Sequence, residues 1–453
     1  MTLPPQPVSA RHPLIDRDAR VLWHPATHFS DLDALPPIPI DRAEGAWLVT
    51  PDQRRYLDAI ASWWTSVHGH CHPAIVDAVS RQVAALDHVM FAGFTHEPAV
   101  ALAEALLERA PAGFGKVFFS DCGSASIEVA LKLSFQARQQ RNEPKRTRFA
   151  ALHNSYHGET LGALAVCGHD AYRSLFSPLL MDVLYLPSPG LEHHDHRDLA
   201  AQAGADEDAT RLAIAQLEAH ADELTAVILE PLVQCAGRMT MTGSGYYRAI
   251  AHAAQRLGIH VIADEIAVGF GRTGKLFASD WAGVSPDLLC LSKGLSGGVL
   301  PLACTLIRAG FEEDFAGSPS RSFLHSHTFT GNPVACRAGL ASLALFDDPA
   351  TFAQIDQLVE NLERWRHVVA ESAPIRAHRQ AGTIVAFDVD TTRLRAIPGD
   401  RLGFALRKAA LERHVLLRPL HDTVYWMPPL CLKPDELERL AHVTIEIIRE
   451  VSA

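Results

Sequence analysis

Short, continuous apolar runs alternate with helix-like segments between about residues 115 and 310. Such runs predict strands that are buried on both faces, as in a parallel sheet with helices on each side. The predicted strands are Lys116–Phe119, Arg148–Leu152, Val183–Leu186, Ala226–Leu229, Ile259–Ala263, Leu288–Leu291 and Leu302–Ile307. We therefore predict a three-layer α/β/α domain.

The pattern changes after about residue 340. A helical stretch is followed by GTIVAFDVD, HVLLRP and TVYWMP, and a closing helix is predicted from about Pro434. Strands bracketed by helices predict a smaller α+β domain at this end of the chain. The first forty residues are Pro-rich, end in PPIPI and read as irregular, so we expect them to wrap over a neighbouring surface.

Composition and charge narrow the class of protein. The chain has 453 residues, of which 48% are hydrophobic and 21% are charged, which is typical of a soluble enzyme. The net charge is −11 and no cluster of Lys and Arg stands out, so we expect neither nucleic acid nor a membrane as partner. No apolar run has the length of a signal-peptide core or a membrane span, and we expect a cytoplasmic protein.

Cysteine and histidine spacing gives no sign of a metal site. The eight cysteines form no CxxC pair, which predicts free, mostly buried thiols rather than a zinc site or a disulfide framework. The run from His193 to His196 (HHDH) has no partner ligands nearby in the sequence, and we interpret it as a surface loop. We expect no bound metal.

The first candidate site follows the strand that ends near residue 120. Ser120–Ser126 (SDCGSAS) precedes a predicted helix in which Ile127, Ala130 and Leu131 form an apolar stripe. Small residues at a helix N-terminus expose backbone N–H groups, which predicts a phosphate site. The alternative is an ordinary helix cap made by Ser124.

Two further strand ends carry an acid and a base. Asp264 ends the apolar run VIAD, where a carboxylate can keep a pyridine nitrogen protonated. Lys293 follows the run LLCL, where desolvation would make its amine nucleophilic toward an aldehyde. Taken singly, each has a structural alternative, a capping Asp and a solvated Lys. The two residues are 29 positions apart, enough for one crossover between parallel neighbours.

Ligands of open α/β sheets bind at the carboxyl ends of the strands, so we expect these three features to meet in one site. Together they predict pyridoxal 5'-phosphate (PLP) held as a Schiff base on Lys293. A competing motif is Gly269–Gly274 (GFGRTG), which matches the GxGxxG dinucleotide fingerprint and leaves an NAD-dependent dehydrogenase as an alternative. No helix start follows this motif, and we interpret it as a tight loop carrying Arg272.

The chain resembles the class III, fold-type-I aminotransferases over nearly its whole length. This resemblance rests on the segments SDCGSASIEVALK, YHGET, ILEP, ADEIAVGFGRTG, LSKGL and HTFTGNPVAC. Within the family the chain looks closest to the branch that converts 8-amino-7-oxononanoate to 7,8-diaminononanoate in biotin biosynthesis. That narrower resemblance rests on WHPAT, SWW, HGHCHP, HVMFAGFTH, LRPL and YWMPP.

The resemblance implies a PLP-dependent transaminase with a ping-pong cycle, in which S-adenosylmethionine is the expected amino donor. It implies a homodimer with shared active sites. The fold implied by the resemblance is an α/β/α large domain, with a mostly parallel seven-stranded sheet, and a smaller α+β domain. The implied divisions are residues 1–65 as a dimer-wrapping arm and part of the small domain, 66–340 as the large PLP-binding domain, and 341–453 as the C-terminal small domain.

The resemblance also implies roles for single residues. Lys293 would bind the cofactor and move a proton, Asp264 would pair with the ring nitrogen, and Tyr156 would stack on the ring and touch the substrate. Further cofactor contacts are implied for Gly123, Ser124, Glu230, His327 and Thr328, the last from the neighbouring subunit. Arg418 would bind the carboxylate of the keto acid, and the other implied substrate contacts are Trp64, Tyr156, Lys293, Ser326 and Tyr425.

Four positions depart from relatives. Ala26 stands where the family commonly has Tyr, Ser326 and His327 stand where Gly-Pro is common, and Ala267 stands where ornithine-type relatives carry Gln. Ala267 argues against the ornithine-type branch. The departures at Ala26, Ser326 and His327 leave open another class III aminotransferase, with an ω-amino acid or diamine donor and a keto-acid acceptor. A binding or regulatory protein that keeps the fold without catalysis is a further alternative. The sequence leaves the donor open between S-adenosylmethionine, lysine and others.

Overall fold

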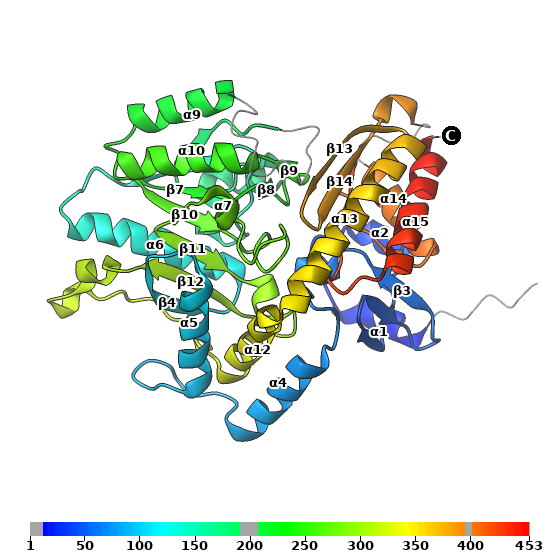
Figure 1. The fold of residues 1–453 in the computed structure, drawn as a ribbon, viewed down its shortest axis with the longest axis horizontal. Coiled ribbons are helices and arrows are strands. Elements are labelled where there is room, and N and C mark those ends of the chain that lie inside the picture. Colours follow the sequence, from blue (N-terminus) through cyan, green and yellow to red (C-terminus); the bar gives the residue numbers. More distant parts are fainter. Residues whose placement is uncertain (1–11, 191–206, 395–400, 453) are drawn as a thin grey trace, which may run out of the picture.

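A computed structural model describes residues 12–190, 207–394 and 401–452, and its largest element is a seven-stranded sheet (Figure 1). The strand order is β4-β12-β11-β10-β7-β5-β6, and only β12 runs antiparallel to its neighbours among the described strands of this sheet. This confirms the predicted fold class. The strands are β4 (Phe114–Ser120), β5 (Arg148–Leu152), β6 (Val183–Leu186), β7 (Leu224–Leu229), β10 (His260–Asp264), β11 (Leu288–Leu291) and β12 (Ala303–Arg308).

Helices cover both faces of this sheet. Alternate residues of β5 divide between two cores, since Phe149 and Ala151 pack with the helix that follows β4, whereas Ala150 and Leu152 pack on the opposite side. Burial on both faces explains why the strands read as continuous apolar runs. One face carries α6 (Gly123–Gln140) and α7 (Leu161–Ala165), and the other carries α5 (Glu97–Arg109), α9 (Glu207–Ala219), α10 (Gly243–Arg256) and α12 (Pro333–Ala344).

The C-terminal region lies beside the large sheet and is built on a smaller, antiparallel sheet of order β13-β14-β16 (Figure 1). Its strands are β13 (Ile375–Ala381), β14 (Ile384–Val389) and β16 (Thr423–Trp426), and its helices are α13 (Pro349–Ser372), α14 (Leu402–Glu412) and α15 (Pro434–Ser452). The strands in GTIVAFDVD and TVYWMP and the closing helix were predicted, but β13 was not.

The segment before residue 65 packs with this C-terminal region. The short strands β1 (Arg42–Glu44), β2 (Trp47–Val49) and β3 (Arg55–Asp58) form a sheet with β15 (Val415–Leu416). Strand β15 runs parallel to β3, with Val415 opposite Leu57. The predicted domain boundaries at residues 65 and 340 remain a prediction.

The prediction of an irregular N-terminal segment is wrong for residues 13–21 and 29–34, which form α1 (Pro13–Val21) and α2 (Phe29–Ala34). His12 Nδ1 accepts the N–H of Leu14 at 3.2 Å, and Pro13 takes the first helical position, where a missing N–H costs nothing. His28 caps α2 by accepting the N–H of Ser30 at 3.3 Å. Proline in this segment therefore starts a helix instead of preventing one.

Six further elements complete the helices and strands that bear on the site. They are α3 (Ala61–Trp64), α4 (Pro73–Ala85), α8 (Asp170–Arg173), α11 (Ser279–Ala282), β8 (Val233–Gln234) and β9 (Thr240–Met241). None of the helices in the described ranges has the length and apolar character that crossing a bilayer requires.

The cysteines are free, as predicted, and five of the eight are buried. Within residues 12–190, 207–394 and 401–452, no three His, Cys, Asp or Glu side chains gather where they could hold a metal ion. The predicted surface loop at 193–196 lies outside the described residues.

Candidate active site

A cavity of about 160 Å³ lies at the carboxyl edge of the large sheet. Seven of the residues predicted for the site line it, and all but Trp64, which lies in α3, come from strand ends of this sheet or from the segments that follow them. Its lining residues are Trp64, Cys122, Gly123, Ser124, Tyr156, His157, Gly158, Glu230, Asp264, Ile266, Ala267, Val268, Ser292 and Lys293. The sheet therefore brings together the three features that the sequence places on separate strand ends.

One end of the cavity is the N-terminus of α6. Cys122 is the N-cap residue, and its side chain makes no capping hydrogen bond, so the first N–H groups of this long helix stay available to a ligand. The interpretation of Ser124 as the helix cap is wrong, because its Oγ accepts the N–H of Glu159 at 3.2 Å from inside the first turn. Free N–H groups and the helix dipole favour an anion here.

Asp264, at the end of β10, supplies a negative charge at a second point of the cavity. Its carboxylate is 5% exposed, lies 2.7 Å from His157 Nδ1 through Oδ2, and accepts the N–H of Ile266 at 3.1 Å through Oδ1. His157 Nε2 is buried and has no hydrogen-bond partner in the described part of the chain. With Nδ1 donating to Asp264, the imidazole holds this carboxylate in place and leaves it able to face a cationic ring nitrogen.

Lys293 begins a short 3-10 turn directly after β11 and has a left-handed φ of +46°. Its ammonium lies 4.9 Å from the ring centroid of Trp64 and, within the described ranges, takes part in no hydrogen bond or ion pair. Burial lowers the pKa of Lys293, although the nearby Asp264 acts in the opposite direction. A larger neutral fraction makes this amine a nucleophile.

Glu230 follows β7 and holds the Tyr156 segment. Its Oε2 accepts the N–H of Tyr156 at 3.0 Å, and its Oε1 accepts the N–H of Cys235 at 3.1 Å. Burial, followed by the charge of Asp264, raises the pKa of Glu230 well above its ordinary value. The hydroxyl of Tyr156 donates to Glu159 Oε1 at 2.9 Å, so both ends of this tyrosine are fixed.

Trp64 forms the cavity wall opposite Lys293. Its Nε1 donates to the hydroxyl of Tyr425 at 3.2 Å, and Tyr425 is fully buried behind it rather than in the lining. Residues 61–64 all have φ between +45° and +76°, a left-handed run that non-glycine residues rarely adopt. This backbone buries Trp64 and leaves its neighbour Trp63 43% exposed.

Arg418 lies beside the cavity and not in its lining. Its guanidinium stacks 4.6 Å above the Trp63 ring, and Nη2 donates to the carbonyl of Ala26 at 2.9 Å. Its role as a carboxylate clamp remains a prediction.

Residues 326–328 were predicted to contact the cofactor and the substrate. They lie in an exposed segment and do not line the cavity. His327 Nδ1 is 3.2 Å from Asp121 Oδ2, next to the start of α6, and Thr328 does not line this cavity. The contribution of Thr328 to a neighbouring subunit stays a prediction.

Seven lining residues were not predicted as site residues, namely Cys122, His157, Gly158, Ile266, Ala267, Val268 and Ser292. His157 stands next to Tyr156 in YHGET, but its pairing with Asp264 spans 107 residues and could not be read from spacing.

The GFGRTG segment forms a loop as predicted, with Arg272 buried and donating to the carbonyls of Met427 and Pro428.

Comparison with known proteins gives a consistent result. The family model described as aminotransferase class-III matches residues 30–448. The chain is 39% identical to the adenosylmethionine-8-amino-7-oxononanoate aminotransferase of Synechococcus elongatus over 433 residues, which covers 95% of this chain and 99% of that protein.

Two solved structures are similar in fold and sequence. The crystal structure of the adenosylmethionine-8-amino-7-oxononanoate aminotransferase from Methanocaldococcus jannaschii matches with a TM-score of 0.90 at 30% identity, covering 97% of this chain and 99% of that chain. The omega transaminase from Pseudomonas jessenii in complex with PMP matches with a TM-score of 0.87 at 25% identity, covering 97% and 98%.

Proposed function

The chain belongs to the class-III aminotransferase family, and we propose that it transfers an amino group to 8-amino-7-oxononanoate, which gives 7,8-diaminononanoate in biotin biosynthesis. The enzyme is a PLP-dependent aminotransferase, which overturns the dehydrogenase and the non-catalytic binding protein as alternatives. The substrate proposal rests on one observation: nearly the whole chain is similar to relatives whose names carry this reaction.

The residues of the cavity fit the cofactor at three separate points. The uncapped N-terminus of α6 suits a phosphate, buried Asp264 suits a protonated ring nitrogen, and Lys293 has an amine without a hydrogen-bond partner in the described part of the chain. When bound, PLP accepts electrons from the carbon that bears the amino group and so makes that carbon acidic.

Lys293 is proposed to hold and move the proton of this reaction at Nζ. Burial lowers its pKa, so this amine is neutral more often than an exposed lysine and can accept a proton more readily. Trp64 covers the amine at 4.9 Å and excludes water from it on that side. Tyr156, held by Glu230 and Glu159, is proposed to fix the ring plane from the other side.

Arg418 is proposed to bind the substrate carboxylate. In the absence of substrate, its charge is partly satisfied by the Ala26 carbonyl and by the face of Trp63. A carboxylate forms a stronger, charge-assisted pair than a backbone carbonyl does, so the substrate can replace the Ala26 contact. Tyr425 would act indirectly, by fixing Trp64.

A homodimer with shared sites is proposed from the surface around Thr328. Exposed apolar side chains of two segments gather there, with His88 and Phe329 4.9 Å apart and Met90, Phe94 and Leu324 more than half exposed. Exposed apolar surface of this kind is typical of a subunit interface. Co-expression of Lys293→Ala and Thr328→Glu subunits tests the sharing, because a mixed dimer would contain one intact site and recover activity that neither variant has alone.

The amino donor is tested by half-reaction spectra of the cofactor-loaded enzyme. The visible absorption should bleach with S-adenosylmethionine and return on addition of 8-amino-7-oxononanoate. Bleaching by lysine alone, with the same recovery, would keep the substrate and change the donor.

A second candidate is an aminotransferase that uses an ω-amino acid or diamine donor. It is favoured by Ala26, which stands where the family commonly has Tyr and offers Arg418 only its backbone carbonyl. Bleaching by β-alanine alone, with no recovery by 8-amino-7-oxononanoate, would replace the first proposal with this one.

A further inference from the structure

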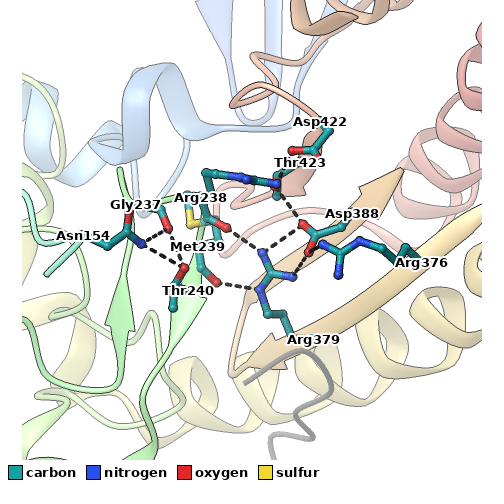
Figure 2. A network of polar contacts seen from close by, with 10 residues as sticks. All are labelled: Asn154, Gly237, Arg238, Met239, Thr240, Arg376, Arg379, Asp388, Asp422 and Thr423. Atoms are coloured by element: carbon teal, nitrogen blue, oxygen red, sulfur yellow. Dashed lines mark hydrogen bonds and ion pairs between the residues drawn. The ribbon is translucent and has the colours of Figure 1, made fainter. Parts of the chain in front are cut away.

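A network of polar contacts joins the C-terminal sheet to the β8–β9 hairpin beside the active site (Figure 2). At its centre, Arg379 of β13 and Asp388 of β14 are 4% and 5% exposed and form a two-point ion pair, with Nη1 to Oδ2 at 2.9 Å and Nη2 to Oδ1 at 3.1 Å. Burial would raise the pKa of Asp388, but the hydrogen bonds and charge of Arg379 outweigh it and hold the pKa below its ordinary value. The carboxylate is therefore charged, and the guanidinium is fixed in one plane.

Arg379 uses its other donors on the hairpin. Its Nε donates to the carbonyl of Met239 at 2.8 Å, and its Nη2 donates to the carbonyl of Arg238 at 2.6 Å. Arg238 and Met239 have φ of +61° and +52°, a left-handed pair that lets two successive carbonyls converge on one guanidinium. A strained turn of this kind persists only where its surroundings hold it. Arg379 binds both of its carbonyls, and the side chain of Arg238 adds contacts to Asp422 and Thr423 (Figure 2).

The same turn is bonded to the segment that carries Tyr156. Asn154 Nδ2 donates to the Gly237 carbonyl at 2.8 Å and lies 3.1 Å from Thr240 Oγ1 (Figure 2). The Glu230 carboxylate adds a second link, since it accepts the N–H groups of both Cys235 and Tyr156. The hairpin is thus tied to the Tyr156 segment at two points and to the C-terminal sheet through Arg379.

We propose that Arg379 is a positioning residue for the transamination reaction, which sets the place of Tyr156 in the active site from the C-terminal sheet. The proposal rests on the part of the proposed function that places Tyr156 against the cofactor ring. Removal of Arg379 would release the strained turn, and Asn154 and Glu230 would then carry that displacement to Tyr156.

Arg376 supplies a matched control. It lies on the same strand and binds the same oxygen, Asp388 Oδ2, at 3.0 Å, but its side chain is 46% exposed. Arg379→Gln removes the ion pair and the two hairpin contacts, whereas Arg376→Gln removes an ion-pair contact to the same carboxylate. A merely structural role for Arg379 would lower thermal stability without changing how the ring of the bound cofactor is held.

The test is visible circular dichroism of each variant loaded with PLP, together with kcat and KM. Arg379→Gln should change the cofactor band and lower kcat by about 10- to 100-fold, as expected for a displacement on the order of 1 Å, with a smaller effect on KM. Arg376→Gln should keep both within about twofold of the wild type. Asn154→Ala should reproduce the changed cofactor band without altering the C-terminal sheet.

A wild-type cofactor band and kcat in Arg379→Gln would overturn the proposal, whatever the change in melting temperature. If that variant does not fold, an unchanged band in Asn154→Ala would overturn it. The spectrum requires no substrate. If the wild type does not act on 8-amino-7-oxononanoate but Arg379→Gln still changes the cofactor band, the proposed substrate is contradicted and the role of Arg379 is not.

Discussion

In the seven-stranded sheet the charged groups stand at the ends of strands, whereas in the three-stranded C-terminal sheet they stand within them. Asp264 ends β10 and Lys293 follows β11, and the amine forms no ion pair in the described part of the chain. Arg379 and Asp388 lie inside β13 and β14 and bind each other at two points. The first sheet thus presents its charges to a cavity, and the second satisfies its charges internally.

The difference separates groups kept for chemistry from groups kept for geometry. A buried amine without a partner has a lowered pKa and can react, which is the state of Lys293. A buried carboxylate with several donors stays charged and unreactive, which is the state of Asp388. Substitutions in the two sheets should therefore affect different measurements.

Replacement of Lys293 by Ala should have the largest effect on activity. Loss of the amine removes both the attachment point and the proton carrier, so turnover should fall by at least about 10⁴-fold. Borohydride reduction followed by peptide mapping should find no cofactor on the variant. Lys275→Ala is the control, because Lys275 follows the glycine-rich loop and lies over the Trp281 ring, outside the lining of the cavity. Wild-type turnover in Lys293→Ala would contradict the assignment.

Replacement of Asp388 by Ala should have the largest effect on stability. It leaves the buried guanidinium of Arg379 without its carboxylate, which typically costs about 3–5 kcal/mol. The free energy of unfolding from urea titrations measures this cost. Asp356→Ala, on the exposed side of α13, should change it by less than about 0.5 kcal/mol. Equal losses in both variants would remove the distinction between the two sheets.

The same contrast explains which parts of the fold could be predicted from sequence. Strands buried on both faces, such as β7 and β10, are continuous apolar runs and were predicted. Strand β13 was missed because it carries Arg379 and Gln380 as buried residues, whose burial depends on partners in other strands and in α13. A buried charge inside a strand reads as an exposed loop when its partner is unknown.

The site was predictable where a residue's role follows from its place at a strand end. Asp264, Lys293 and the start of α6 needed only the rule that ligands bind at the carboxyl edge. The pairing of His157 with Asp264 and the left-handed run at residues 61–64 depend on tertiary packing that local pattern does not contain. The same holds for Arg418, whose contacts with Trp63 and Ala26 join distant parts of the chain.

Replacement of Arg418 by Ala should have an intermediate effect, limited to one half of the reaction. A charge-assisted pair with a carboxylate is worth about 1.5–3 kcal/mol, so the keto-acid half-reaction should slow by roughly 10- to 100-fold. The donor half-reaction should change much less. Stopped-flow measurement of each half-reaction separates the two, and equal damage to both would remove the carboxylate assignment.

The smallest predicted effect is a difference in acid sensitivity between the two regions. Burial, and then the charge of His72, lowers the pKa of His68 to about 4, and its Nε2 lies 3.1 Å from Ser342 Oγ. A group with a lowered folded-state pKa takes up its proton in the unfolded chain first. Its stabilising contribution is therefore present above the ordinary value of 6.5 and is lost as the pH falls toward 4.

Between pH 6.5 and 5.5 the wild type should lose about 1 kcal/mol relative to His68→Gln, which has no proton to bind. The exposed His252→Gln should show no such difference. The pKa of Asp388 is lowered from 3.8, so its contribution is present above that value and is lost only at lower pH. Urea titrations at both pH values measure the difference. If Asp388→Asn loses stability relative to wild type equally at pH 6.5 and 5.5 while the His68→Gln difference narrows, the acid-sensitive contact is the one between His68 and Ser342 of α12. If the difference in unfolding free energy between wild type and His68→Gln does not change with pH, His68 is not the source of the acid sensitivity.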